Sequence, residues 1–278
     1  MEDKLSKYEQ ERLLMYAKYK KYRLIGFLTL IVLVGLIFLI LASNIRSKYD
    51  SFIKSNVIDG LIKEMYPDGN YLPDSMININ YINSLGIYQS PDRWFGEDYF
   101  SGSYKGISFA CSEVRLQERR ERRDSKGNVQ VYYVDYFNGR FYSFTFEKEF
   151  KERLQIMEKR ANGRVSGRLT KFDTESIEFN KKFNTYATDQ HYVFYQLTPV
   201  IQLNLLQFES IHRGTIQALY DKNRLDIAVN DSKNTLHLGL KTPLLKENLE
   251  NVIHDIQMPA AIINEFNLDS DKFKNLNL

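Results

Sequence analysis

The pair of residues in this sequence that most resembles catalytic machinery is Asp189 and His191. In a strand, residues two apart point to the same face, so an aspartate at 189 could orient a histidine at 191 that acts as a general base. The competing interpretation is that Asp189 turns or caps the chain by bonding nearby backbone amides. We favour the second interpretation, because no nucleophile can be named for the pair.

Cys111 is the only cysteine, and it follows Phe109-Ala110 in an apolar run that is typical of a core residue rather than a reactive thiol. A single cysteine excludes an internal disulfide and the usual cysteine-rich zinc sites. The histidines have no metal-binding spacing, and the glycines lack the flanking pattern of a phosphate-binding loop. These are His191, His212, His237 and His254, and Gly102, Gly106, Gly163 and Gly167. We therefore predict no catalytic residue, no metal site and no cofactor.

The densest positive charge is predicted at the tip of a hairpin. Its residues are Arg115, Arg119, Arg120, Arg122, Arg123 and Lys126. One interpretation is a solvated tip, partly neutralised by Glu118, Glu121 and Asp124. The other is contact with anionic phospholipid headgroups, to which each basic residue contributes about 1 kcal/mol. Nucleic acid is a less favoured partner, because no aromatic residues alternate with these arginines and the net charge is only +3.

The longest apolar run of the chain extends from Leu24 to Ile45 and contains no charged residue. A helix over residues 24–44 would be about 31 Å long, which matches a hydrocarbon core of about 30 Å. We therefore predict one transmembrane helix that anchors the chain in the cell membrane.

Basic residues stand on both sides of this run. Lys18, Lys20, Lys21 and Arg23 precede it, and Arg46 and Lys48 follow it. The positive-inside rule favours a cytoplasmic N-terminus. Because the second flank is also basic, the side of the membrane that holds the rest of the chain stays open.

The remaining organisation is read from periodicity and turn signals. Residues 1–23 are predicted to form a polar helical tail, residues 45–95 a juxtamembrane helix and linker, and residues 96–278 a soluble domain. Expected strands cover 99–119, 129–146, 164–171, 191–197, 215–220, 225–229 and 236–240. Expected helices cover 146–159, 175–186, 199–213, 244–256 and 260–266, with a break at Pro259. Because strands and helices do not alternate, the expected fold is α+β, with an antiparallel sheet packed by helices.

Several runs give the sequence a family resemblance. They are Glu97-Asp98-Tyr99, Gly102-Ser103-Tyr104-Lys105-Gly106, Ser112-Glu113-Val114, Phe137-Asn138-Gly139-Arg140-Phe141-Tyr142, Glu175-Ser176-Ile177-Glu178-Phe179, Phe183, Thr188-Asp189-Gln190 and Tyr195-Gln196-Leu197-Thr198-Pro199. Over roughly residues 95–270 the chain resembles the bacterial family called domain of unknown function 3137. The resemblance implies a membrane-attached protein with a soluble domain, and it implies no established activity.

The function that we favour from the sequence is a membrane-anchored, non-catalytic binding or scaffold module that acts on a protein partner or on the membrane surface. Two alternatives stay open. A membrane-tethered hydrolase would gather Asp189 and His191 with Glu178 or Glu113 in one cleft. An envelope or lipid-handling protein would need an apolar groove in the sheet.

Overall fold

The structure, a computed structural model, describes residues 2–29, 34–125, 127–211 and 214–274. The chain divides into two compact units. The first comprises Met1–Met65 and Thr235–Gln257, and the second comprises Tyr66–Asn234 and Met258–Leu278.

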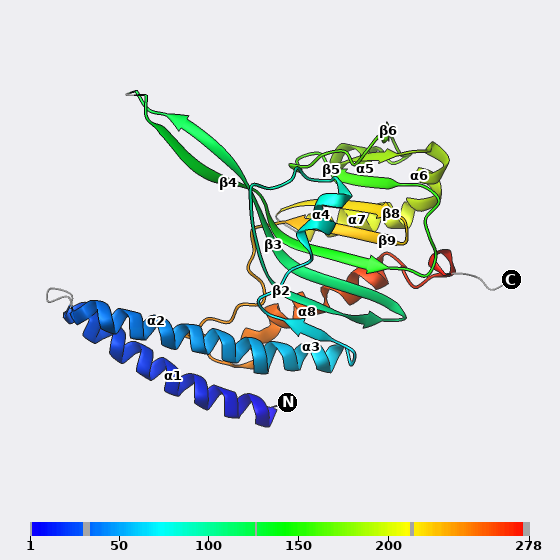
Figure 1. Ribbon diagram of the computed structural model, residues 1–278. Coiled ribbons are helices and arrows are strands. Elements are labelled where there is room, and N and C mark those ends of the chain that lie inside the picture. The colour runs from blue at the N-terminus through cyan, green and yellow to red at the C-terminus, as the bar shows by residue number, and fades with distance from the viewer. Residues whose placement is uncertain (1, 30–33, 126, 212–213, 275–278) are drawn as a thin grey trace. The chain divides into compact units, whose positions relative to one another are not determined.

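The first unit is built on two long helices, α1 (Glu2–Leu28) and α2 (Val34–Ile53) (Figure 1). Tyr8 packs edge-on against Phe52 and Tyr22 stacks on Phe38, so the two helices run antiparallel. A π-helical turn, η2 (Lys54–Ile58), and α3 (Asp59–Met65) continue the second helix. This confirms the helices predicted on both sides of the apolar run.

The single helix predicted over residues 24–44 is corrected by the structure. α1 ends at Leu28, Thr29 follows in a turn in which its Oγ1 donates to the Ile25 carbonyl oxygen (2.7 Å), and α2 begins at Val34. Residues 30–33 of the predicted helix lie outside the described residues. Among the helices that the structure describes, none has the length and apolar character needed to cross a bilayer.

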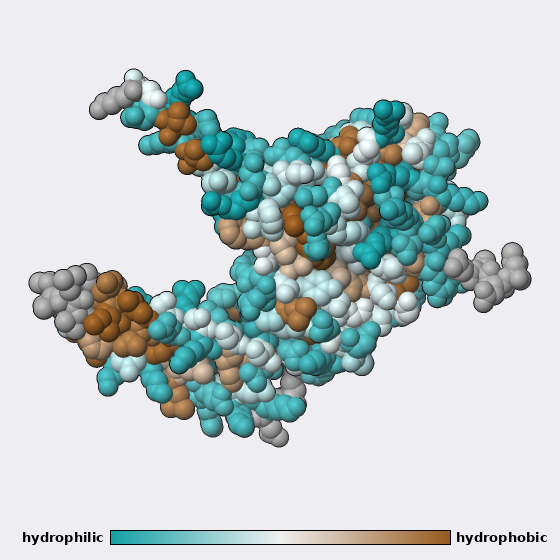
Figure 2. Space-filling view, viewed as in Figure 1, coloured by the Kyte–Doolittle hydropathy of each residue, from teal (hydrophilic) through white to brown (hydrophobic). Residues whose placement is uncertain are grey.

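The helices α1 and α2, which share the apolar run, approach each other closely at Gly26. A Cβ atom on Gly26 would lie 3.1 Å from the Leu39 side chain and 3.2 Å from the Gly35 carbonyl oxygen, so a larger residue would push α1 and α2 apart. Apolar side chains gather on the outer surface at this end of the helix pair (Figure 2). The large exposed ones are Leu24, Phe27, Leu28, Leu36, Ile37, Ile40 and Leu41, called the apolar end below.

The second unit contains a sheet of nine strands among the described residues, in the order β1-β2-β3-β4-β9-β8-β5-β7-β6. Every neighbouring pair is antiparallel, which confirms the predicted α+β class. The strands are β1 (Asn70–Leu72), β2 (Arg93–Tyr104), β3 (Ile107–Arg123), β4 (Val129–Thr145), β5 (Leu154–Glu158), β6 (Thr170–Phe172), β7 (Phe183–Ala187), β8 (Thr215–Asp221) and β9 (Arg224–Asn230).

Strands β3 and β4 form a long hairpin whose outer part extends beyond the sheet as a two-stranded arm (Figure 1). The pairing of β2 with β3 ends at Gln117, so the pairs from Arg119–Tyr133 to Arg123–Val129 have no third strand beside them. The predicted hairpin is confirmed. Its predicted first strand, 99–119, contains two strands instead, because a two-residue turn at Lys105-Gly106 separates β2 from β3.

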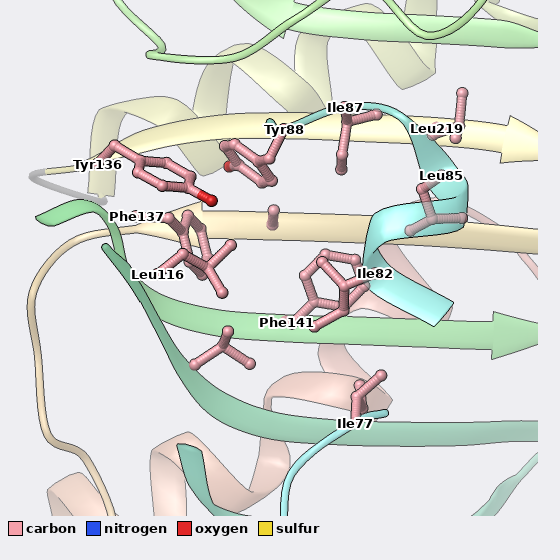
Figure 3. Close-up of a cluster of buried hydrophobic side chains, with 12 residues drawn as sticks. Ile77, Ile82, Leu85, Ile87, Tyr88, Leu116, Tyr136, Phe137, Phe141 and Leu219 are labelled. Carbon is pink, nitrogen blue, oxygen red and sulfur yellow. The ribbon is translucent and has the colours of Figure 1, made fainter. Parts of the chain in front are cut away.

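The core of the sheet unit lies against the helix α4 (Ile79–Leu85). Ile82 and Leu85 from this helix, together with Tyr88, pack on Phe137 and Phe141 of β4 (Figure 3). The five central residues of β8 and of β9 are all buried, which requires cover on both faces of the sheet. Figure 3 shows α4 on the near side of the strands and helices behind them.

The other described helices are α5 (Ile177–Lys182), α6 (Gln190–Gln196), α7 (Pro199–Ile211), α8 (Lys246–Glu265) and the 3-10 turn η3 (Asp271–Phe273). The helix predicted from Pro199 is confirmed. Several predictions were wrong. Residues 191–197 lie in or next to the helix α6 rather than a strand, residues 146–159 contain β5, and residues 236–240 form no strand. The helix predicted over 175–186 ends at Lys182 and is followed by β7, and only the end of the strand predicted over 164–171 lies in β6. The predicted break at Pro259 is also absent, since α8 continues through this proline.

Candidate functional site

The most concentrated charge in the sheet unit lies on one face of β2, β3 and β4. Glu97 is the register partner of Glu113, and Glu113 is in turn the partner of Arg140. Residues directly opposite in antiparallel strands share a face, so the three side chains form a row across the sheet. Asp98 adds a fourth charge, because the register shifts between Glu97 and Phe100 and Asp98 has a positive φ of 57°.

The carboxylate oxygens of Glu97, Asp98 and Glu113 lie within 4.8 Å of one another. Such oxygens are the ligands that Ca²⁺ and Mg²⁺ prefer, so these three residues could hold a hard cation. Positive charge already stands beside them, since Arg140 forms a buried ion pair with Asp231 (2.7 Å) at the end of the same row. The negative charges of this row are therefore partly balanced by Arg140 within the protein.

Asp98 is further tied to the structure by the hydroxyl of Tyr71, which donates to its carboxylate. Burial, and then the negative charge of Asp98, raise the pKa of Tyr71 above its ordinary value. The row borders a groove of about 650 Å³. Its lining includes Asp74, Glu97, Glu113, Arg115, Asn138 and Lys233. The groove is thus lined largely by polar and charged groups.

Sequence reasoning did not place these carboxylates together, because it treated residues 99–119 as one strand. A local signal was present in Lys105-Gly106. Both residues have positive φ (49° and 79°), which is the requirement of a type I′ hairpin turn, and glycine at the second position favours it. Reading that turn would have set Asp98 opposite Glu113, and the register shift between Glu97 and Phe100 then moves Glu97 into that place.

The predicted pair Asp189 and His191 lies at the start of α6, where Asp189 is the N-cap. Its carboxylate accepts a hydrogen bond from the Tyr192 backbone N–H (3.2 Å), so the capping interpretation is confirmed. Both residues line a pocket of about 460 Å³, but neither Glu178 nor Glu113 lines it. The gathering of Asp189 and His191 with Glu178 or Glu113 in one cleft is therefore not found.

The predicted basic cluster is exposed where it is described, and Lys126 lies outside the described residues. Arg119, Arg120, Arg122 and Arg123 lie on the hairpin arm, whereas Arg115 lies in the sheet between β2 and β4. Three arginines pair with carboxylates: Arg115 with Asp135 (2.9 Å), Arg119 with Glu121 (2.6 Å) and Arg120 with Glu118. Arg122 and Arg123 have no carboxylate partner within the described part of the chain. The outermost arginines thus keep the largest share of their charge for a partner.

Cys111 is buried on β3, and burial raises the pKa of its thiol well above the ordinary value. That agrees with its interpretation as a core residue. His191, His237 and His254 are all exposed, and His212 lies outside the described residues.

Comparison with known proteins finds a family match over part of the chain. Residues 135–268 match the family described as protein of unknown function (DUF3137), which confirms the resemblance for the segment from β4 into α8 and onward. No curated protein matches the sequence of this chain. A solved structure, that of the mycobacterial trehalose monomycolate transport factor A, TtfA, matches with 7% sequence identity and a TM-score of 0.41, covering 75% of this chain and 93% of that one. A likeness of this degree carries no argument about function.

Proposed function

We propose that this protein attaches to a membrane surface through the α1–α2 helix pair and acts there as a non-catalytic binding module. The observation that carries the proposal is the apolar end, where seven large apolar side chains are exposed on two neighbouring helices. A contiguous apolar patch of this kind on a protein surface marks a site that another apolar phase covers.

The residues beside the apolar end favour lipid as that phase. Lys20, Lys21 and Arg23 precede it on α1, and Arg46 and Lys48 follow it on α2, all of them exposed. An apolar end bordered by basic residues matches an anionic bilayer, in which acyl chains lie beneath negatively charged headgroups. The tyrosines Tyr16, Tyr19 and Tyr22 stand at the level where interfacial aromatic residues are enriched.

The length of the apolar end supports shallow insertion into one leaflet. From Leu24 to Leu28 the α1 axis rises about 6 Å, and from Leu36 to Leu41 the α2 axis rises about 8 Å. Interfacial helices bury their apolar surface about 5–10 Å deep. Because the helices are antiparallel, both basic flanks then face the same headgroup layer, and the anionic cytoplasmic leaflet is the one that they favour.

A binding role for the sheet unit is favoured over the two alternatives. The hydrolase required Glu113 or Glu178 beside Asp189, and these residues lie on β3 and α5, outside the pocket next to His191. Lipid handling required an apolar groove in the sheet, and the groove beside Glu97 is lined largely by charged and polar residues.

Flotation of the full chain with vesicles of phosphatidylcholine and phosphatidylserine tests the attachment. The variants Leu28→Asp and Ile37→Asp place a charge within the apolar end. A charged side chain costs up to about 2.5–3.5 kcal/mol at the centre of a bilayer and less near its surface, so each variant is expected to bind at least tenfold more weakly. Ile177→Asp is the matched control, because Ile177 on α5 is as exposed as Leu28 (73% each).

Wild-type protein that stays at the bottom of the gradient would end the proposal. So would Leu28→Asp and Ile37→Asp variants that float as well as Ile177→Asp.

A further inference from the structure

Asp189 caps α6, and this role does not account for the pocket that Asp189 and His191 line. It lies between α6, the segment 148–152 and η3, all in the sheet unit, and its volume is about 460 Å³. Pockets that bind small molecules occupy about 300–1,000 Å³. The size therefore permits a ligand.

Two buried donors in this pocket have no acceptor. Gln196 is 1% exposed, and its side-chain Nε2 has no hydrogen-bond partner among the described residues. The hydroxyl of Tyr192 is likewise buried and without a partner there. Both residues line the pocket. Buried polar groups are nearly always hydrogen-bonded, so acceptors of a ligand that enters this cavity would satisfy both donors.

Lys272 brings a positive charge to the same place. Its Nζ donates to the carbonyl oxygens of Tyr195 (2.8 Å) and Gln196 (3.2 Å) and lies 4.6 Å from the centre of the Tyr195 ring. An ammonium group has three donors, so one remains for a further acceptor. Burial, and then the charge of Lys148, lower the pKa of Lys272 to about 8.

Three carboxylates also line the pocket, and two of them hold local donors. Glu152 accepts from the Thr188 hydroxyl, and Asp189 accepts from the Tyr192 backbone N–H. The third, Glu149, is exposed to solvent. Among the described residues, none of the three accepts a hydrogen bond from Lys272 Nζ, Gln196 Nε2 or the Tyr192 hydroxyl.

Aromatic rings form part of the wall. Phe150, Tyr192 and Tyr195 line the pocket, and the rings of Tyr192 and Tyr195 stack with their centres 6.2 Å apart. Such surfaces favour a ligand with a flat or apolar body.

We infer that this pocket binds a small organic anion, whose carboxylate or phosphate accepts hydrogen bonds from Gln196, Tyr192 and Lys272 and whose body packs on the aromatic wall. This inference does not depend on membrane attachment.

Benzoate, phenyl phosphate and neutral benzamide are suitable probes, titrated into the full chain while the side-chain amide signals of glutamine are followed by NMR. For probes of this size we expect a dissociation constant on the order of 1 mM. One of the two anions is expected to shift the Gln196 signal saturably and more tightly than benzamide, and the preferred anion distinguishes a carboxylate ligand from a phosphate ligand.

Tyr192→Phe removes only the unpartnered hydroxyl, and Gln196→Leu replaces the amide by an apolar side chain of similar size, so both are expected to fold. Each should weaken binding of the preferred anion by about tenfold, since a hydrogen bond to a charged group is lost. Tyr132→Phe, on the hairpin arm, is the control and should bind like wild type. The inference is overturned if neither anion binds saturably, if benzamide binds as tightly as both anions, or if Tyr192→Phe and Gln196→Leu bind like the control.

Discussion

Asp226 illustrates how position in the sheet decides the chemistry of one residue. It lies on β9 with Ser143 of β4 and Leu219 of β8 as its register partners, and it is completely buried. The hydroxyl of Tyr81 donates to its Oδ2 (2.7 Å). Burial nevertheless raises the pKa of Asp226 to about 6. Nothing in the sequence around it, Leu225-Asp226-Ile227, distinguishes this aspartate from a solvent-facing one.

The raised pKa predicts how stability depends on pH. Below the ordinary pKa of 3.8, Asp226 is protonated in both folded and unfolded chains, and its contribution to stability is fully present. Between about 4 and 6 the unfolded chain ionises first, so stability falls by on the order of 3 kcal/mol at about 1.4 kcal/mol per pKa unit.

The variant Asp226→Asn cannot ionise and should lack this fall. Denaturant unfolding of both proteins from pH 4 to pH 7 measures the difference, in which the other titrating groups cancel. If the unfolding free energies of the wild type and of Asp226→Asn changed equally with pH over this range, the raised pKa of Asp226 would be contradicted.

At the scale of elements, the sheet depends on a close approach between β4 and the end of β9. A Cβ atom on Gly139 would lie 2.0 Å from the Val229 carbonyl oxygen and 3.1 Å from the Asn230 Cα. Both are backbone atoms, so a larger residue cannot be accommodated by turning a side chain. The glycine is therefore required by packing between strands.

We expect Gly139→Ala to destabilise the protein by roughly 1–3 kcal/mol, because the strands must separate locally. Gly60→Ala is the control. Gly60 lies in α3 with no atom within 4 Å of the added methyl group, and alanine in a helix should raise stability by about 0.5–1 kcal/mol. Chemical denaturation measures both, and an unchanged midpoint for Gly139→Ala would contradict the packing argument.

At the scale of the whole molecule, we propose two surfaces for contact with an anionic membrane: the apolar end in the first unit and the basic arm in the second. They act through different physical effects. Insertion of apolar side chains depends little on salt, whereas attraction of arginines to headgroups is screened within about 8–10 Å at physiological salt. Arg122 and Arg123 should contribute most, since Arg119 and Arg120 already pair with carboxylates.

The charge of the arm predicts that part of the affinity for anionic membranes falls as the salt concentration rises. Replacing Arg119, Arg120, Arg122 and Arg123 by serine should weaken binding to anionic vesicles by at least tenfold at low salt, at up to about 1 kcal/mol per residue. At high salt the variant and the wild type should bind alike. The double variant Lys171→Ser, Lys181→Ser, which removes exposed charge elsewhere in the sheet unit, serves as the control. Affinity equal to that of the control at low salt would exclude the arm as a contact.

Local sequence signals were sufficient for several elements. Asp124 to Asn128 defined the hairpin of β3 and β4, Thr198-Pro199 defined the start of α7, and the turn at Asp221-Lys222-Asn223 defined β8 and β9. These signals depend on backbone preferences and on side chains only a few residues apart. The polar helix before the apolar run and the helix after it were also predicted from such local signals.

Only the tertiary structure decided the features that depend on distant residues. It divided the apolar run between α1 and α2, set Glu97 opposite Glu113, buried Asp226, and placed Lys272 beside Gln196. The sequence by itself determined which segments are apolar, charged or turn-forming, because those are properties of short stretches. Which of these segments meet depends on how the whole chain excludes water and satisfies its hydrogen bonds.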